Sequence, residues 1–333
     1  MKILVLGGSG HIGKRLLQTL ASCDWAEPVG AARKPGRATA GAAASIAVDS
    51  CDLPALSAAL RGFDAVVNCV AGDQRSISEG ARVLVQAALA AQCPRIVHLS
   101  TMSVYGPVEG RIDESAWLDP GLGWYGRAKC EAEQHLSEFA RRGGAAVVLR
   151  PGCVFGPGSE LWVGRVGRWL QAGRLGDLGL AGDGWSNLVH VDDVCQALLA
   201  ALQLPLPAGA APAFNLAAPD SPRWNDYFVD LALALQATPV ARIAPRQLKL
   251  DAWLLSPALK AGQIALKAIG NRKPLLPDPL PPGLLRLWRQ QIALDASRAS
   301  VELGLRWTAY ASSLQDGADW FCANERAPLN GKY

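Results

Sequence analysis

A glycine-rich segment near the start of the chain constrains the fold more than any other feature. Residues 3–6 read Ile-Leu-Val-Leu, residues 7–13 read Gly-Gly-Ser-Gly-His-Ile-Gly, and residues 14–20 have helical periodicity, which predicts strand, turn and helix. These glycines permit a tight turn, let the backbone approach a pyrophosphate, and let the helix pack closely on the strand. N–H groups at the start of the helix then face the phosphates. The segment favours dinucleotide binding over an ordinary turn, with these candidate contacts: Gly7, Ser9, Gly10, His11 (as a packing residue rather than a base), Ile12 and Gly13.

Apolar runs and helical patterns alternate through the first half of the chain. We predict further strands at 29–32, 46–48, 65–70 and 95–99, with helices at 54–60 and 79–92. This alternation predicts a doubly wound parallel sheet with helices on both faces, an α/β fold of the Rossmann type. Ligands on such a sheet lie beyond the carboxyl ends of the strands. We therefore expect one crevice to be lined by residues 7–13, 33, 49, 71–72 and 100–103.

The second predicted strand is followed by the basic pair Arg33-Lys34. An acidic residue at this position would bind the adenosine ribose of NAD, whereas a basic one suits the 2′-phosphate of NADP. Arg37 follows in a Gly/Ala-rich loop and can assist. The pattern predicts NADP as the preferred cofactor, with NAD as the alternative. Solvated loop charges are the other interpretation.

Tyr125 and Lys129 carry the catalytic hypothesis. Residues four apart share a helix face, and a cation beside a phenol lowers a pKa that is otherwise about 10. Alone, this spacing is common on exposed helix faces. However, the predicted strand at 95–99 leads into Ser100, Thr101 and Ser103 near the same crevice. A hydroxyl beside a tyrosine can hold a substrate oxygen while the tyrosine gives or takes its proton.

Composition narrows the class of protein. A net charge of +4 over 333 residues argues against nucleic acid as the main partner. The eight cysteines are scattered without Cys-x-x-Cys spacing, so we expect free thiols in a reducing compartment and no metal site. The start of the chain does not resemble a signal peptide, and no apolar run has bilayer length. These features predict a soluble, cytoplasmic protein without stable membrane insertion.

Several motifs occur in an order that resembles the extended short-chain dehydrogenase/reductase family, in its NAD-dependent epimerase/dehydratase branch. The resemblance covers Met1 to about Asn215. The motifs are Gly-x-x-Gly-x-x-Gly at 7–13, Ala71-Gly72, Ser100-Thr101 before Val104-Tyr105-Gly106, Tyr125-x-x-x-Lys129, Leu149-Arg150-Pro151-Gly152 with Phe155-Gly156-Pro157, and Val189-His190-Val191-Asp192-Asp193-Val194.

The resemblance implies roles for particular residues. Tyr125 would be the acid/base, Lys129 would lower its pKa and hold the nicotinamide ribose, and Thr101 would be the catalytic hydroxyl. Asp49 matches the acid that contacts the adenine, with Asp52 as the less favoured choice. Besides the glycine turn, the implied cofactor contacts are Arg33, Lys34, Asp49, Ala71, Gly72, Ser100, Tyr125, Lys129 and Pro151.

Two departures from the family pattern narrow the chemistry. Met102-Ser103 stands where dehydratases carry Asp-Glu, which argues against dehydration. Ser186 stands where nucleotide-sugar epimerases place a diphosphate-binding arginine. The candidates to replace that arginine are Arg150, Arg165, Arg168 and Arg174. We predict an enzyme, an NAD(P)-dependent oxidoreductase acting on a carbonyl or secondary alcohol of a small or apolar substrate. The alternatives are a nucleotide-sugar 4-epimerase and a non-catalytic NADP sensor.

The resemblance also implies a two-domain organisation. Residues 1–160 and 186–217 would bind the dinucleotide, and residues 161–185 and 218–330 would form a smaller substrate domain. Candidate substrate contacts are Ser103, Trp124 and Trp185. Trp253 is expected in the core, and residues 254–269 are interpreted as a lid or core helix in preference to an amphipathic helix near a membrane. A small-molecule substrate is the expected partner, and a homodimer is a family expectation.

Overall fold

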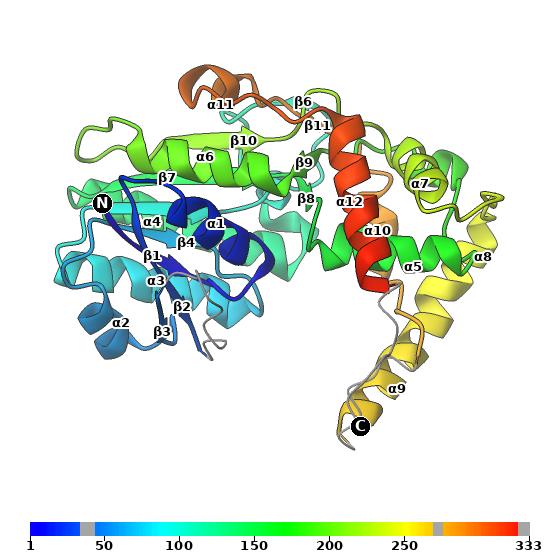
Figure 1. Cartoon of the computed structure of the whole chain (residues 1–333), viewed down its shortest axis with the longest axis horizontal. Coiled ribbons are helices and arrows are strands. Elements are labelled where there is room, and N and C mark those ends of the chain that lie inside the picture. Colours follow the sequence, from blue (N-terminus) through cyan, green and yellow to red (C-terminus); the bar gives the residue numbers. More distant parts are fainter. Residues whose placement is uncertain (34–43, 269–275, 326–333) are drawn as a thin grey trace. The chain divides into compact units, whose positions relative to one another are not determined.

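The computed structural model describes residues 1–33, 44–268 and 276–325, which belong to two units (Figure 1). The N-terminal unit comprises Met1–Gly152, Val189–Pro219 and Leu294–Trp307, and the C-terminal unit comprises Cys153–Leu188, Asp220–Ala293 and Thr308–Tyr333. The expected division instead placed 218–219 and 294–307 in the substrate domain, and 153–160 and 186–188 in the dinucleotide-binding domain. Residues 294–307 contact β10 (Ala213–Leu216) of the N-terminal unit: Arg298 of α11 (Ser297–Glu302) donates to the Ala213 carbonyl at 3.3 Å, and the Asn215 amide donates to the Asp295 carbonyl at 3.1 Å.

The predicted parallel sheet is confirmed in the N-terminal unit. Seven described strands pair in the order β10-β7-β5-β4-β1-β2-β3, and the pairs are parallel. In the register, Leu6 lies opposite both Ala31 and Asn68. The strands are β1 (Lys2–Leu6), β2 (Glu27–Ala32), β3 (Ala44–Ala47), β4 (Ala65–Asn68), β5 (Arg95–Leu99), β7 (Ala145–Pro151) and β10 (Ala213–Leu216). Shorter strands are β6 (Gly110–Ile112), β8 (Cys153–Phe155), β9 (Leu188–His190) and β11 (Ile292–Leu294).

Helices cover both faces of the sheet, as the alternation predicts (Figure 1). On one face α1 (His11–Ala21) packs beside α6 (Val191–Gln203), and on the other α2 (Leu53–Ala59), α3 (Gln74–Ala90) and α4 (Trp124–Arg141) lie side by side. Leu4, Val66 and Ile96 of the strands share one buried cluster with Leu136 and Phe139 of α4. The central strands β1, β4 and β5 are mostly apolar, as expected for parallel strands that helices cover on both faces.

Polar residues move two element boundaries away from the predicted positions. Strand β4 ends at Asn68, two residues early, because the Asn68 side chain accepts the Val70 N–H at 3.1 Å. Helix α3 begins at Gln74, because Asp73 caps it by accepting the Ser76 N–H at 2.7 Å. Asp52, the less favoured candidate for the adenine contact, instead caps α2.

The C-terminal unit is built mainly from helices. Its core is aromatic: the rings of Trp224 and Phe228 stack at 5.6 Å, and Trp288 meets Phe228 edge-on at 5.2 Å. The helices are α5 (Arg165–Gln171), α7 (Trp224–Ala234), α8 (Pro245–Leu250), α9 (Ser256–Ala268), α10 (Pro282–Leu287) and α12 (Tyr310–Glu325), with π-helical turns at Glu160–Gly164 and Asp251–Leu255. The expectation for Trp253 is wrong, because its side chain is 65% exposed.

Two features of the whole described chain bear on function. All eight cysteines are free thiols, as predicted. None of the described helices is both long and apolar enough to span a membrane.

Candidate functional site

The β1–α1 turn accepts only glycine at two of its positions. Gly7 has φ +77°, and a Cβ there would lie 2.9 Å from the Cys69 carbonyl. A Cβ on Gly13 would lie 2.3 Å from the Gly7 oxygen. The turn is held to β2, because the N–H groups of Gly7 and Gly8 both donate to the Ala31 carbonyl. Helix α1 starts at His11 without a side-chain cap, and the start of a helix is a position that favours an anion.

A cavity of about 290 Å³ opens at this turn. The structure brings together here most of the residues that the strand ends predict. Its lining consists of Leu6, Gly7, Ser9, Gly10, His11, Ile12, Gly13, Ala31, Ala32, Arg33, Val48, Ser50, Cys69, Val70, Ala71 and Ser76. Among these described residues Arg33 is the only one with a formal charge, and none is acidic.

Some predicted contacts lie elsewhere. Asp49 does not line the cavity: it is exposed, and its carboxylate accepts the Cys51 N–H at 3.0 Å. Gly72 follows Ala71 but is not part of the lining. Lys34 and Arg37 lie outside the described residues. The sequence interpretation missed Ser50 and Ser76, although the Asp73 cap signal places Ser76 in the first turn of α3.

Lys129 lies buried beneath the ends of β4 and β5. Its Nζ donates to the Leu99 carbonyl at 2.6 Å and to the Val70 carbonyl at 3.4 Å. Burial lowers the pKa of Lys129 to about 8, while Cys69 and Glu133 oppose that shift. Lys129 is thus a buried ammonium group, and it lies one helical turn after Tyr125 on α4.

The buried ammonium predicts a specific dependence of stability on pH. The folded-state pKa of Lys129 is about 8 and the ordinary value is 10.5, so between these pH values the unfolded chain binds the extra proton. Stability therefore rises with pH in this window. Urea denaturation gives the unfolding free energies of the wild type and of Lys129→Met at each pH. The wild-type value minus the Lys129→Met value should rise by up to about 3 kcal/mol between pH 7 and pH 10. Lys14→Met, at an exposed lysine of α1, should show no such trend, and a flat difference for Lys129→Met would contradict the burial of a charged ammonium.

Tyr125 is half-buried at the start of α4. Its ring packs against the buried Ile77 and Ala81 of α3, and the exposed Trp124 ring meets it edge-on at 5.7 Å. The following residue, Gly126, is a feature that the sequence interpretation missed. A Cβ there would lie 2.7 Å from the Ser103 carbonyl oxygen. Gly126 therefore lets the first turn of α4 lie directly against the segment that carries the predicted hydroxyls.

Thr101 and Ser103 form the turn that meets α4. The Thr101 hydroxyl accepts the Ser103 N–H at 3.2 Å and lies 3.4 Å from the Ser103 hydroxyl. The short 3-10 helix η1 (Met102–Tyr105) follows and packs on α4. The predicted substrate-side residues Thr101, Ser103 and Trp124 thus belong to the neighbourhood of Tyr125. Pro151 ends β7 and is buried.

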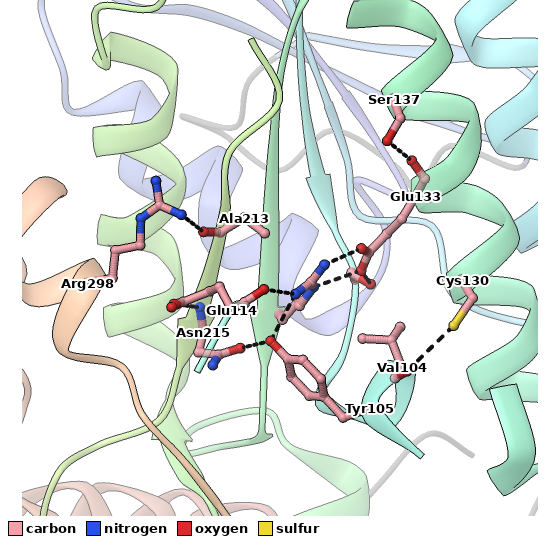
Figure 2. A network of polar contacts seen from close by, with 11 residues as sticks. Val104, Tyr105, Glu114, Cys130, Glu133, Ser137, Ala213, Asn215 and Arg298 are labelled. Carbon is pink, nitrogen blue, oxygen red and sulfur yellow. Dashed lines mark hydrogen bonds and ion pairs between the residues drawn. The ribbon is translucent and has the colours of Figure 1, made fainter. Parts of the chain in front are cut away.

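A buried polar network involves Tyr105, the last residue of η1, and Glu133 of α4 (Figure 2). Glu133 of α4 accepts from the Ser100 hydroxyl at 2.5 Å and from Arg150, whose Nη2 lies 2.7 Å from Oε2. Arg150 also donates to the Tyr105 hydroxyl at 2.9 Å, and Tyr105 donates to Asn215 at 2.6 Å. Both charged side chains are 7% exposed. The network joins η1, β7, β10 and α4 through Tyr105, Arg150, Asn215 and Glu133, and Ser100 binds it just after β5.

The network gives two predicted ligand contacts partners within the protein. The Ser100 hydroxyl, expected at the cofactor, is bound to Glu133. Arg150, a candidate to replace the missing arginine, is occupied by Glu133 and Tyr105. Two other candidates are also ion-paired within the C-terminal unit: Arg168 with Glu160 and Asp278, and Arg174 with Asp251.

Ser186 and Trp185 have structural partners in the C-terminal unit. Ser186 is fully buried and donates to the Pro222 carbonyl at 2.6 Å. The Arg223 guanidinium lies over the Trp185 ring, 4.5 Å from its centroid. Within the described residues, no three His, Cys, Asp or Glu side chains gather as metal ligands.

Comparison with known proteins finds related sequences and folds. The profile described as "NAD dependent epimerase/dehydratase family" matches residues 3–217. Protein YeeZ of Escherichia coli K12 is 29% identical over 254 residues, which cover 72% of this chain and 86% of that protein. The 2-alkyl-3-oxoalkanoate reductase of Stenotrophomonas maltophilia is 32% identical over 217 residues, covering 60% of this chain and 64% of that protein. The UDP-glucose 4-epimerase of Thermotoga maritima, solved with UDP-glucose, shares the fold at a TM-score of 0.74 and 19% identity, covering 98% of this chain and all of that one.

Proposed function

The chain belongs to the NAD dependent epimerase/dehydratase family, and within it we propose that the protein is an oxidoreductase that reduces a carbonyl, or oxidises the corresponding alcohol, on a small or apolar substrate. The observation that carries the proposal is the placement of Lys129, buried on α4 one turn after Tyr125. A non-catalytic cofactor sensor would gain nothing from a desolvated ammonium beside a phenol.

The residues of the site support a division of roles. The glycine turn and the start of α1 would hold the pyrophosphate of the dinucleotide, and Lys129 the nicotinamide ribose. When bound, the cofactor supplies or accepts a hydride. Tyr125 gives the substrate oxygen its proton in reduction and removes it in oxidation, and the Lys129 charge stabilises the resulting phenolate. Thr101 would hold the same oxygen, with Ser103 and Trp124 beside the substrate.

Reduction is favoured over nucleotide-sugar epimerization because three of the four arginines that could replace the diphosphate-binding arginine are ion-paired, which leaves Arg165 as the remaining candidate. Ser186 is buried where the diphosphate arginine is expected, and Arg150, Arg168 and Arg174 are ion-paired. A relative named as a reductase of 2-alkyl-3-oxoalkanoates, 32% identical to this chain, is consistent with an apolar keto substrate. An epimerase would use the same tyrosine and lysine but would retain its cofactor between turnovers.

The cofactor proposal yields a prediction for Arg33. Because Arg33 is the only formally charged residue among the described residues that line the cavity, it would bind the 2′-phosphate of NADP(H). The purified protein should be free of stoichiometric NAD and should bind NADPH more tightly than NADH. Arg33→Asp should lower NADPH affinity about 10- to 100-fold, since hydrogen bonds to a charged group are lost and repulsion is added. Isothermal titration calorimetry with NADPH and with NADH measures the affinities of the wild type and of Arg33→Asp.

A matched variant separates local from general charge effects. Arg61→Asp makes the same change at an exposed arginine after α2, outside the cavity, and should leave both affinities unchanged. If Arg33→Asp leaves the ratio of the two affinities unchanged, Arg33 does not bind the phosphate. Stoichiometric NAD released from denatured protein would favour the epimerase instead.

A further inference from the structure

Exposed apolar side chains gather on one helical run of the C-terminal unit. Helix α8, the π-helical turn at Asp251–Leu255 and α9 form a continuous run from Pro245 to Ala268 (Figure 1). Of thirteen large apolar residues that are exposed in the described chain, five belong to this run, whereas the others are dispersed over many elements. They are Leu250, Trp253, Leu254, Leu255 and Ile264, between 47% and 69% exposed. Such a concentration marks an interaction surface, and we call it the apolar ridge.

The opposite side of the run is anchored, so the ridge is a fixed feature of the fold. Leu248, Ala252 and Ser256 are buried. Asp251 accepts from Arg174 at 2.6 and 2.8 Å, and the Ser256 hydroxyl accepts the Leu280 N–H at 2.6 Å. A hollow of about 800 Å³ beside the ridge is lined chiefly by apolar groups, among them Leu250, Leu254 and Ala258.

The exposed charged side chains on the run itself are all positive. Arg246, Lys249 and Lys260 are exposed along the same run. Asp251 is the single acid in Pro245–Ala268, and Arg174 already neutralises it. A second copy of the chain packed here about a two-fold axis would bring cations against cations, which costs free energy. A partner that suits this surface has a negatively charged surface layer over an apolar interior.

We propose that the apolar ridge docks on an anionic lipid bilayer surface. Trp253, Leu254 and Ile264 enter the boundary between headgroups and acyl chains, where an indole and aliphatic side chains are stabilised. Lys249 and Lys260 extend their stems along the apolar layer and place their ammonium groups among lipid phosphates. The helix lies in the plane of the interface and does not cross it. This docking does not depend on the substrate chemistry proposed above.

Flotation of the full chain with lipid vesicles tests the docking. The protein should float with vesicles of phosphatidylcholine mixed with phosphatidylglycerol, less with phosphatidylcholine alone, and less again at high salt because the charge contribution is screened. The double variant Trp253→Ser/Leu254→Ser should bind the anionic vesicles about tenfold or more weakly, since the buried apolar area is lost. Lys249→Gln/Lys260→Gln should lose the preference for anionic lipid.

Matched controls make the result decisive. Trp117→Ser, at a 90% exposed tryptophan of the N-terminal unit, and Leu180→Ser, at a 91% exposed leucine of the C-terminal unit, should bind vesicles as the wild type does. Far-ultraviolet circular dichroism verifies that each variant is folded. If folded wild type and Trp253→Ser/Leu254→Ser float equally, or if the wild type ignores vesicles and the double variant converts a dimer to a monomer in light scattering, the membrane assignment is wrong.

Discussion

Tyr125→Phe should lower turnover by about 10²- to 10⁴-fold, which is the range for loss of a general acid or base. The change removes only the phenolic oxygen. The ring remains to pack on Ile77 and Ala81, so the fold and the cofactor cavity should persist. NADPH affinity should therefore change little while the rate on the substrate found by a carbonyl screen collapses. Initial rates and calorimetric cofactor titration on the same preparation measure the two quantities.

A second tyrosine provides the matched control. Tyr310 donates its hydroxyl to Asp230 in the C-terminal unit at 2.9 Å, so Tyr310→Phe also removes one hydrogen-bonded phenol oxygen. It should retain nearly the full rate. Equal rates for wild type and Tyr125→Phe would show that the proton comes from another group.

Glu133→Gln should destabilise the N-terminal unit by about 3–5 kcal/mol, because removing one partner of a buried ion pair leaves the other charge uncompensated. Arg150 would keep its bond to Tyr105 but lose both charged contacts to Glu133. The Ser100 hydroxyl would also lose its carboxylate acceptor. Urea denaturation at pH 7 measures the loss.

Helix α4 contains the control for this variant. Glu138 pairs with Arg141 on its exposed surface, where the two side chains are 43% and 75% exposed. Glu138→Gln should cost under about 1 kcal/mol, because exposed ion pairs contribute little. Similar losses for Glu133→Gln and Glu138→Gln would mean that the buried pair is not required. Arg150→Met/Glu133→Leu, which removes both charges, should recover much of the stability lost in Glu133→Gln.

The strands and the glycine turn were predictable because local pattern determines them. Apolar runs of strand length and glycines at fixed spacing require no knowledge of distant residues, and β5 lies at the predicted residues. The side-chain partners were not predictable in this way. Whether Arg150 binds a ligand or Glu133 depends on the fold bringing β7 against α4, and nothing in the spacing of the two residues indicates it. Trp253 was misassigned for a similar reason, since the composition of a helix does not show which face is covered.

The polar network includes contacts between residues that lie far apart in the sequence. The Asn215 amide donates to the carbonyls of Ile112 and Asp295 at 3.1 Å each, and the Asp295 N–H donates to Ile112 at 2.8 Å. Asp295 leaves the ribosome long after Asn215, since Asp220–Ala293 of the C-terminal unit lies between them in the sequence. Such non-local contacts form late in folding. During translation, the contacts of Asn215 and Ile112 with Asp295 can therefore form only after the segment at 294–307 has been synthesised, and a nascent chain that stops before this segment lacks them.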